Sequence, residues 1–129
     1  MKQLENKIAI VTGGTRGIGF STVEAFLQEG ATVILCGSRP ESAEKAVQAL
    51  KAQDPAAKVE GISPELSDYE SVKAAFDAVA EKYGRIDILV NNAGMSDATP
   101  FADYTPEQFQ KVMDLNVNGM FNCTRAVTD

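Results

Sequence analysis

Residues 8–26 read IAIVTGGTRGIGFSTVEAF and contain three successive patterns. The first, Ile8–Thr12, is a β-branched and apolar run with the composition of a strand that is buried on both faces. Four glycines follow within seven residues. An apolar stripe at helical spacing comes last, formed by Ile18, Thr22, Ala25 and Phe26. The stretch therefore predicts a strand, a glycine-rich turn and a helix, in that order.

A turn of this kind is suited to binding phosphate. The start of a helix offers unpaired backbone N–H groups and a positive dipole end, and glycine lets an anion approach that backbone closely. The spacing here is Thr12-Gly13-x-x-x-Gly17-x-Gly19 rather than the tighter G-x-G-x-x-G of many dinucleotide sites. The alternative is an ordinary turn that uses glycine for positive φ. The density of glycines favours an anion site.

The composition is that of one soluble domain. At 129 residues the chain is long enough for a real core, and its net charge of −6 argues against nucleic acid as the main partner. Cys36 and Cys123 lie far apart without metal-ligand spacing, so we expect reduced packing residues and no metal site. Because neither a signal-peptide core nor a stretch of membrane-spanning length is apparent, we expect a cytoplasmic protein without a membrane partner.

Three more strands are predicted at 32–36, 58–62 and 86–90, with helices between them. The strand at 58–62 carries charge, which favours the edge of a sheet. Alternating strands and helices indicate an α/β fold with parallel strands and right-handed crossovers. We expect a Rossmann-type doubly wound parallel sheet of about four strands in the order 3-2-1-4. Its ligand site would lie beyond the carboxyl ends of the first and fourth strands, where the glycine turn and residues 91–94 both fall.

Three helix starts carry capping-box patterns. Each joins a predicted N-cap to a residue three positions later: Ser38 with Glu41, Ser67 with Glu70, and Thr105 with Gln108. The apolar stripe of the last helix is formed by Phe109, Val112, Met113, Val117, Met120 and Phe121. Asn116 falls on this stripe, so its amide is expected to point inward and to be hydrogen-bonded. On this reasoning alone, two roles for Asn116 are equally favoured: a structural residue that hydrogen-bonds the helix to a neighbouring strand, or a catalytic residue.

The second strand indicates which dinucleotide fits. NAD sites place Asp or Glu about 20 residues past the glycines, where it accepts hydrogen bonds from the ribose hydroxyl. Here no carboxylate stands at that point; Arg39 follows the strand and Arg16 lies inside the glycine turn. Guanidinium groups bind a 2′-phosphate, so we favour NADP(H) over NAD(H). The alternative is that both arginines are solvated loop residues that bind no phosphate. The negative charge of Glu41 would also partly offset the positive charge of Arg39.

Three motifs in register resemble the short-chain dehydrogenase/reductase family. They are Thr12-Gly13-Gly14-Thr15-Arg16-Gly17-Ile18-Gly19, Asn91-Asn92-Ala93-Gly94, and Asn116 in Leu115-Asn116-Val117-Asn118-Gly119. The resemblance covers the whole chain. It implies an NAD(P)-dependent oxidoreductase that interconverts a ketone and a secondary alcohol by hydride transfer. The sequence looks most like 3-oxoacyl-carrier-protein reductases and bacterial hydroxysteroid dehydrogenases, which implies a small carbonyl or alcohol substrate and a homodimer or homotetramer.

The resemblance also implies roles for individual residues. Thr12 would brace the loop after the fourth strand, Ile18 would line the pyrophosphate turn, and Asn116 would organise a water leading to the active-site lysine. Glu65 and Leu66 would flank the adenine, although the family usually has Asp at position 65. The full set implied for cofactor binding is Thr12, Gly13, Thr15, Arg16, Gly17, Ile18, Gly19, Ser38, Arg39, Glu65, Leu66, Asn91, Asn92, Ala93 and Gly94.

The catalytic Ser and Tyr-x-x-x-Lys of that family would lie beyond Asp129. We therefore expect 1–129 to be the NAD(P)-binding domain, with the catalytic half absent and no turnover by this part alone. The one matching string, Tyr69 to Lys73, stands at the start of a helix and is interpreted as a chance match. The alternative function is a non-catalytic NADP(H)-binding module. A downstream Ser and Tyr-x-x-x-Lys would favour the enzyme.

Overall fold

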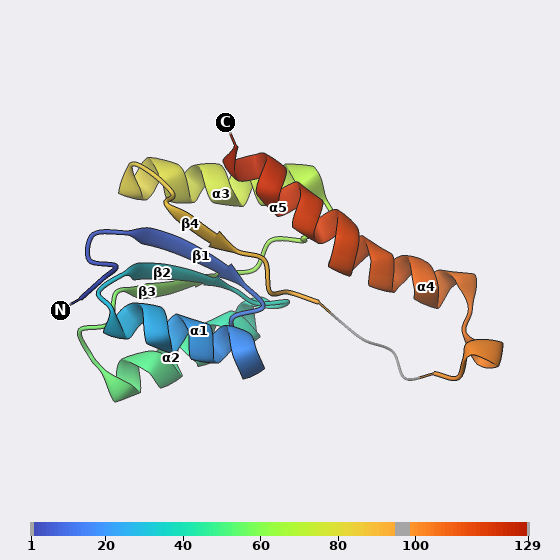
Figure 1. Cartoon of the computed structure of the whole chain (residues 1–129), viewed down its shortest axis with the longest axis horizontal. Helices are drawn as coiled ribbons and strands as arrows, with labels where there is room; N and C mark the ends of the chain where they lie inside the picture. The colour runs from blue at the N-terminus through green and yellow to red at the C-terminus, as the bar shows by residue number, and fades with distance from the viewer. Residues whose placement is uncertain (1, 95–98, 129) are drawn as a thin grey trace.

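The computed structural model describes residues 2–94 and 99–128 and has a parallel sheet at its centre (Figure 1). Its strands are β1 (Ile8–Thr12), β2 (Thr32–Cys36), β3 (Val59–Ile62) and β4 (Ile88–Val90). The order β3-β2-β1-β4 and the parallel pairing confirm the predicted α/β fold, and β3 lies at an edge as expected. β4 begins at Ile88 rather than at residue 86. Just before it, the carboxylate of Asp87 accepts the Ile8 N–H at 2.8 Å, a bond between a side chain and the strand.

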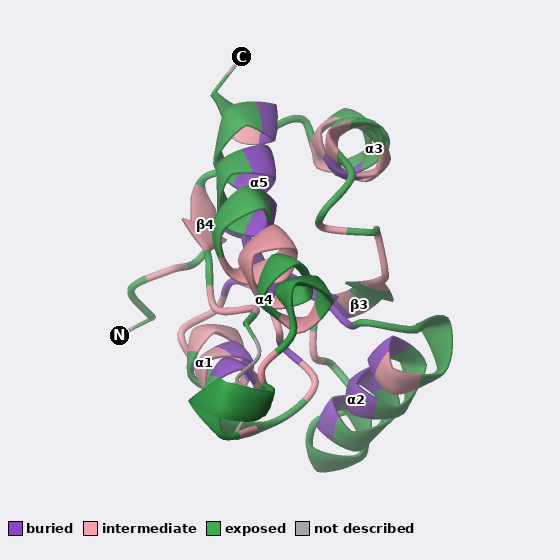
Figure 2. Cartoon of the chain, turned by 90° about the vertical axis from the view of Figure 1, so that its right-hand side faces the viewer, coloured by how far each residue is buried: buried purple, intermediate pink, exposed green. Residues whose placement is uncertain are grey.

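Helices cover both faces of this sheet. They are α1 (Gly17–Gln28), α2 (Pro40–Gln53), α3 (Tyr69–Tyr83), α4 (Pro106–Met113) and α5 (Gly119–Val127), with the short helical turns η1 (Phe101–Asp103) and η2 (Asp114–Asn118). α1 and α2 lie on one face, and α3 and α5 lie on the other (Figures 1 and 2). Successive residues of β1 alternate between the two cores: Val11 packs with α1 and α2, and Ile10 packs with α3 and α5.

Two of the three predicted N-caps are wrong by one residue. α2 has Arg39 as its N-cap instead of Ser38, because Pro40 occupies the first helical position, where its missing N–H costs nothing. α3 has Asp68 as its N-cap instead of Ser67, because a carboxylate satisfies the helix N–H groups at least as well as a hydroxyl. The third prediction is confirmed: Thr105 caps α4 with both bonds of a capping box.

The predicted apolar stripe on the last helix is not buried in this chain. Phe109, Val117, Met120 and Phe121 are 55%, 44%, 51% and 64% exposed. The buried face of α5 consists instead of Gly119, Asn122, Cys123 and Ala126, the purple stripe in Figure 2. The π-helical turn η2 between α4 and α5 changes the residues per turn, so the spacing read along one uniform helix fails there. The exposed stripe therefore faces away from the sheet.

A polar cluster joins the edge strand β3 to the end of α3. The Glu60 carboxylate accepts hydrogen bonds from the Lys82 ammonium at 2.7 Å and from the Tyr83 hydroxyl. Partial burial pushes the pKa of Glu60 upward, but these bonds outweigh it and hold the pKa below its usual value. The cluster is thus arranged around an ionised carboxylate.

No helix in the described ranges 2–94 and 99–128 is long and apolar enough to cross a membrane.

Candidate active site

The glycine turn presents the start of α1 to the carboxyl ends of the strands. Gly13 and Gly17 adopt positive φ values of 66° and 61°. The N-cap of α1, Arg16, makes no side-chain hydrogen bond to the helix, which leaves the first backbone N–H groups without a cap. Gly19 comes so close to the turn that a Cβ there would lie 2.0 Å from the Gly13 carbonyl oxygen. Sterically, this turn requires glycine at position 19.

Thr12 ties the glycine turn to the loop after β4. Its side chain is 1% exposed, and its Oγ1 accepts the backbone N–H groups of Asn92 and Ala93, each at 3.0 Å. Asn92 adds a second tie, because its Nδ2 donates to the Gly13 carbonyl at 3.2 Å. The bracing contact that the resemblance implied for Thr12 is therefore present. The two loops form one continuous wall.

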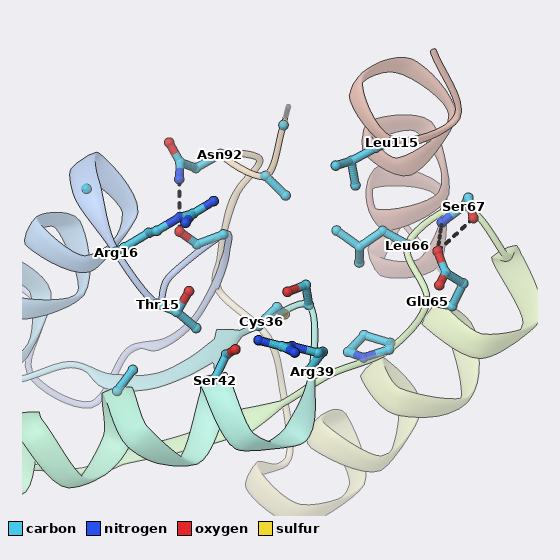
Figure 3. A pocket seen from close by; sticks show the side chains of 18 of the residues that line it. Thr15, Arg16, Cys36, Arg39, Ser42, Glu65, Leu66, Ser67, Asn92 and Leu115 are labelled. Carbon is cyan, nitrogen blue, oxygen red and sulfur yellow. Dashed lines mark hydrogen bonds between the residues drawn. The ribbon is translucent and has the colours of Figure 1, made fainter. Parts of the chain in front are cut away.

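This wall borders a cleft of about 1390 Å³ at the carboxyl ends of the strands (Figure 3). Eleven of the fifteen residues predicted to bind the cofactor line it. They are Gly13, Thr15, Arg16, Gly17, Ser38, Arg39, Glu65, Leu66, Asn92, Ala93 and Gly94. The structure thus brings together residues from four separate loops at the predicted switch point of the sheet.

Four predicted residues lie outside the lining of this cleft. Thr12 and Gly19 are buried beneath it and shape the turn. Ile18 is 79% exposed on α1. Asn91 faces α5 and donates its amide to the Thr124 hydroxyl at 3.1 Å.

The cleft residues that α2 and α4 contribute were not predicted from the sequence. Those on α2 follow helical spacing along one face, as do those on α4, so a helical wheel would have grouped each set without showing that it borders the cleft. The additional lining residues are Phe20, Cys36, Gly37, Ser42, Lys45, Ala46, Ala49, Pro64, Ser67, Glu107, Gln110, Lys111, Asp114 and Leu115.

Side chains of both charges line the cleft. Its carboxylates are Glu65, Glu107 and Asp114, and its cations are Arg16, Arg39, Lys45 and Lys111. Within the described part of the chain, Arg16, Arg39 and Lys45 form no ion pair. Figure 3 shows Arg16 and Arg39 on either side of Thr15 and Ser42. The Glu65 carboxylate accepts the Ser67 hydroxyl at 2.8 Å. Unpaired cations beside hydroxyl groups are suited to a phosphate.

The sequence pattern of the family described as short chain dehydrogenase matches residues 7–129. This chain belongs to the short-chain dehydrogenase family. A crystal structure of a protein called gox2181 is similar, with a TM-score of 0.89 and 38% identity over 96% of this chain and 48% of that one.

Two curated relatives match most of the chain. It is 53% identical over 123 residues to a 3alpha-hydroxysteroid dehydrogenase of Mediterraneibacter gnavus, which covers 95% of this chain and 49% of the relative. It is 36% identical over 125 residues to a 3-oxoacyl-(acyl-carrier-protein) reductase of Thermotoga maritima, covering 97% and 50%. The chain therefore spans about half the length of these short-chain dehydrogenases.

Asn116 lies in the π-helical turn η2 of this short-chain dehydrogenase. It is half-buried, and its Oδ1 lies 3.2 Å from the position that a Cβ on Gly94 would occupy. Glycine at position 94 thus leaves room for the amide beside the cleft. By contrast, Tyr69 and Lys73 do not line the cleft, and Lys73 pairs with Asp77 at 3.0 Å.

Neither thiol is poised for nucleophilic chemistry. Cys36 and Cys123 are free and buried in the core against α3 and α5. Burial raises the pKa of the Cys36 thiol well above its usual value, with Cys123 adding to the effect, and burial raises the pKa of Cys123 to about 11. Both thiols are therefore protonated at neutral pH, consistent with packing. The described residues include no group of three or more candidate metal ligands.

Proposed function

We propose that residues 1–129 are the NAD(P)-binding domain of an oxidoreductase that interconverts a ketone and a secondary alcohol by hydride transfer. The observation that carries the proposal is the pair of Thr12 bonds, which makes the glycine turn and the loop after β4 one wall of the cleft. A dinucleotide fits this wall: its pyrophosphate would accept the uncapped N–H groups at the start of α1. When bound, the nicotinamide would supply or accept the hydride.

NADP(H) is the proposed cofactor. Arg39 and Arg16 are cations without ion-pair partners in the described structure, and Lys45 and Ser42 on α2 add a further cation and a hydroxyl to the same cleft. A 2′-phosphate would satisfy these charges. One relative at 34% identity, from Lentilactobacillus kefiri, is named an NADP-dependent (R)-specific alcohol dehydrogenase, which is in line with this choice.

The substrate class follows from the relatives and not from the cleft. We favour a hydroxysteroid over a 3-oxoacyl thioester, because the hydroxysteroid dehydrogenase relative is 53% identical and the reductase relative 36%. Asn116 keeps its proposed catalytic role of holding a water that leads to the active-site lysine. Its position next to Gly94, which lines the cleft, supports this role.

Two broader properties are part of the proposal. The exposed stripe of Phe109, Val117, Met120 and Phe121 is suited to pairing with a second copy, so we propose a homodimer or homotetramer. Two free, buried thiols are in keeping with a reducing compartment, so we propose a cytoplasmic location.

A fluorescence titration of the full chain with NADPH and with NADH tests the cofactor assignment. We expect tighter binding of NADPH, by roughly tenfold to a hundredfold, because a hydrogen bond to a charged group contributes about 1.5–3 kcal/mol. The variant Arg39→Ala should lose most of this preference while still binding NADH. Equal affinity of the parent for both dinucleotides would overturn the assignment.

A further inference from the structure

Asn122 is a buried amide whose side chain reaches the wall of the cleft. Among the described residues, only Thr12 and Asn122 are buried polar side chains, and Asn122 is 7% exposed. From α5, its Nδ2 donates to the backbone carbonyl of Leu66 at 2.8 Å. Leu66 lies in the loop between β3 and α3, and its side chain lines the cleft. The bond therefore links the core-facing side of α5 to a residue of the candidate site.

The approach of α5 to this loop is close along a full turn. Gly119, one turn before Asn122, is also buried, and a Cβ there would lie 3.3 Å from the Leu66 Cβ. Gly119 and Asn122 share one helix face because they are three residues apart. Glycine at position 119 lets the loop approach α5 closely, and the Asn122 amide then hydrogen-bonds to the Leu66 carbonyl in that loop.

The loop is held from its other side as well. The Glu65 N–H donates to the Ser71 hydroxyl at 2.9 Å, and the Glu65 carboxylate accepts from Ser67. With the backbone fixed on both sides of Leu66, its side chain points into the cleft beside Leu115 and across from Thr15 and Arg16 (Figure 3). The two leucines form an apolar patch on a wall whose other members are largely polar.

We propose that Asn122 is a positioning residue that holds Leu66 at the spacing required for the purine base of a bound nucleotide. This inference rests on the proposed function, because it needs a nucleotide in the cleft. The base lies flat against an apolar surface only if that surface stays in place, and the Leu66 carbonyl loses its side-chain partner when the amide is removed. Loss of Asn122 then weakens binding through Leu66 and not through direct contact with the ligand.

A double-mutant cycle in the full chain tests this indirect action. We expect Asn122→Ala to weaken the binding of 2′,5′-ADP by about tenfold, the fold-change for about 1.4 kcal/mol. In a Leu66→Ala background the same substitution should weaken binding by less than about twofold, because the wall it positions has already been removed. Asn122→Ser, polar but too short to reach the carbonyl, provides a second variant in case alanine prevents folding.

Val79→Ala is the matched control for a purely structural effect. Val79 is 4% exposed in the core between the sheet, α3 and α5. It is far from the Leu66 loop, because it lies ten residues, about 15 Å, along α3 from Tyr69, where the helix begins after that loop. It should lower stability without changing the affinity for 2′,5′-ADP. Unchanged affinity in both Asn122 variants, or equal effects of Asn122→Ala in the two backgrounds, would overturn the positioning role.

Amide hydrogen exchange separates this inference from the proposed function. In the ligand-free full chain, we expect faster exchange at residues 65–67 in Asn122→Ala but not in Val79→Ala. If the parent does not bind 2′,5′-ADP, the nucleotide proposal fails, and exchange still decides whether Asn122 fixes the loop. Equal exchange in parent and variant would show that it does not.

Discussion

The substitution Thr12→Val should destabilise the protein because it removes a hydroxyl that accepts two backbone N–H groups and donates to the Val90 carbonyl at 3.3 Å. Valine keeps the β-branched shape that β1 requires and replaces the hydroxyl with a methyl group. The Ala93 N–H loses its acceptor at 3.0 Å, and the Asn92 N–H keeps a second one, the Val90 carbonyl at 3.1 Å. Leaving a buried donor unpaired costs about 1–3 kcal/mol, and weakening a shared bond costs roughly 0.5 kcal/mol.

We therefore expect Thr12→Val to lower the free energy of unfolding by about 2–3 kcal/mol, out of roughly 5–15 kcal/mol for a domain of this kind. Urea unfolding followed by circular dichroism measures this loss, with an unchanged denaturant slope as the check on two-state behaviour. Thr12→Ser keeps the acceptor and removes only a methyl group, so it should cost about 1 kcal/mol. A valine variant as stable as the parent, or less damaging than the serine variant, would refute the bracing role.

Three further predictions concern the turn, the cleft and the edge of the sheet. Gly19→Ala should abolish nucleotide binding in a titration, because its Cβ would overlap a backbone oxygen. Gly17→Ala, whose Cβ would meet no protein atom within 4 Å, should cost about 1 kcal/mol of stability through strain at positive φ. Lys45→Gln should weaken NADPH binding severalfold at low salt without affecting NADH. Lys51→Gln, on the same helix but outside the cleft, should change neither affinity. Glu60→Gln should lower stability at pH 7, measured by urea unfolding. Because the folded pKa is depressed, the stability that the carboxylate contributes is present above its ordinary pKa of 4.5 and lost as the pH falls through the lowered value, so parent and variant should converge there. A difference that persists at low pH would contradict this account of the cluster.

Local patterns in the sequence were sufficient to predict the sheet and the turn. The apolar run of β1 and the glycines after it each determine a local conformation, and the alternation of strands and helices leaves few topologies. The loop at 91–94 could be placed beside the glycine turn because both follow neighbouring parallel strands. These predictions needed only the conformational preferences of residues that are close in sequence and the right-handed sense of strand–helix–strand connections.

The two wrong N-caps are errors of choice between neighbouring residues. Arg39 and Asp68 each lie beside a plausible serine, and the local signals that favour them are Pro40 and the Asp68 carboxylate. The other features depend on information that no local pattern contains. The π-helical turn before α5 shifts the helix faces, so Asn122 is buried where the spacing favoured Phe121. Lys45 joins the cleft only because α2 packs beside α1 on one face of the sheet.

An amide NMR titration of the labelled full chain with NADPH and with NADH shows where each dinucleotide binds. We expect the amides of residues 13–19 to shift with both dinucleotides, because both place a pyrophosphate at the start of α1. Amides around Arg39 and Lys45 should shift only with NADPH. Unmoved amides at 13–19, or identical shifts around Arg39 with the two ligands, would rule out NADP(H) binding at the glycine turn.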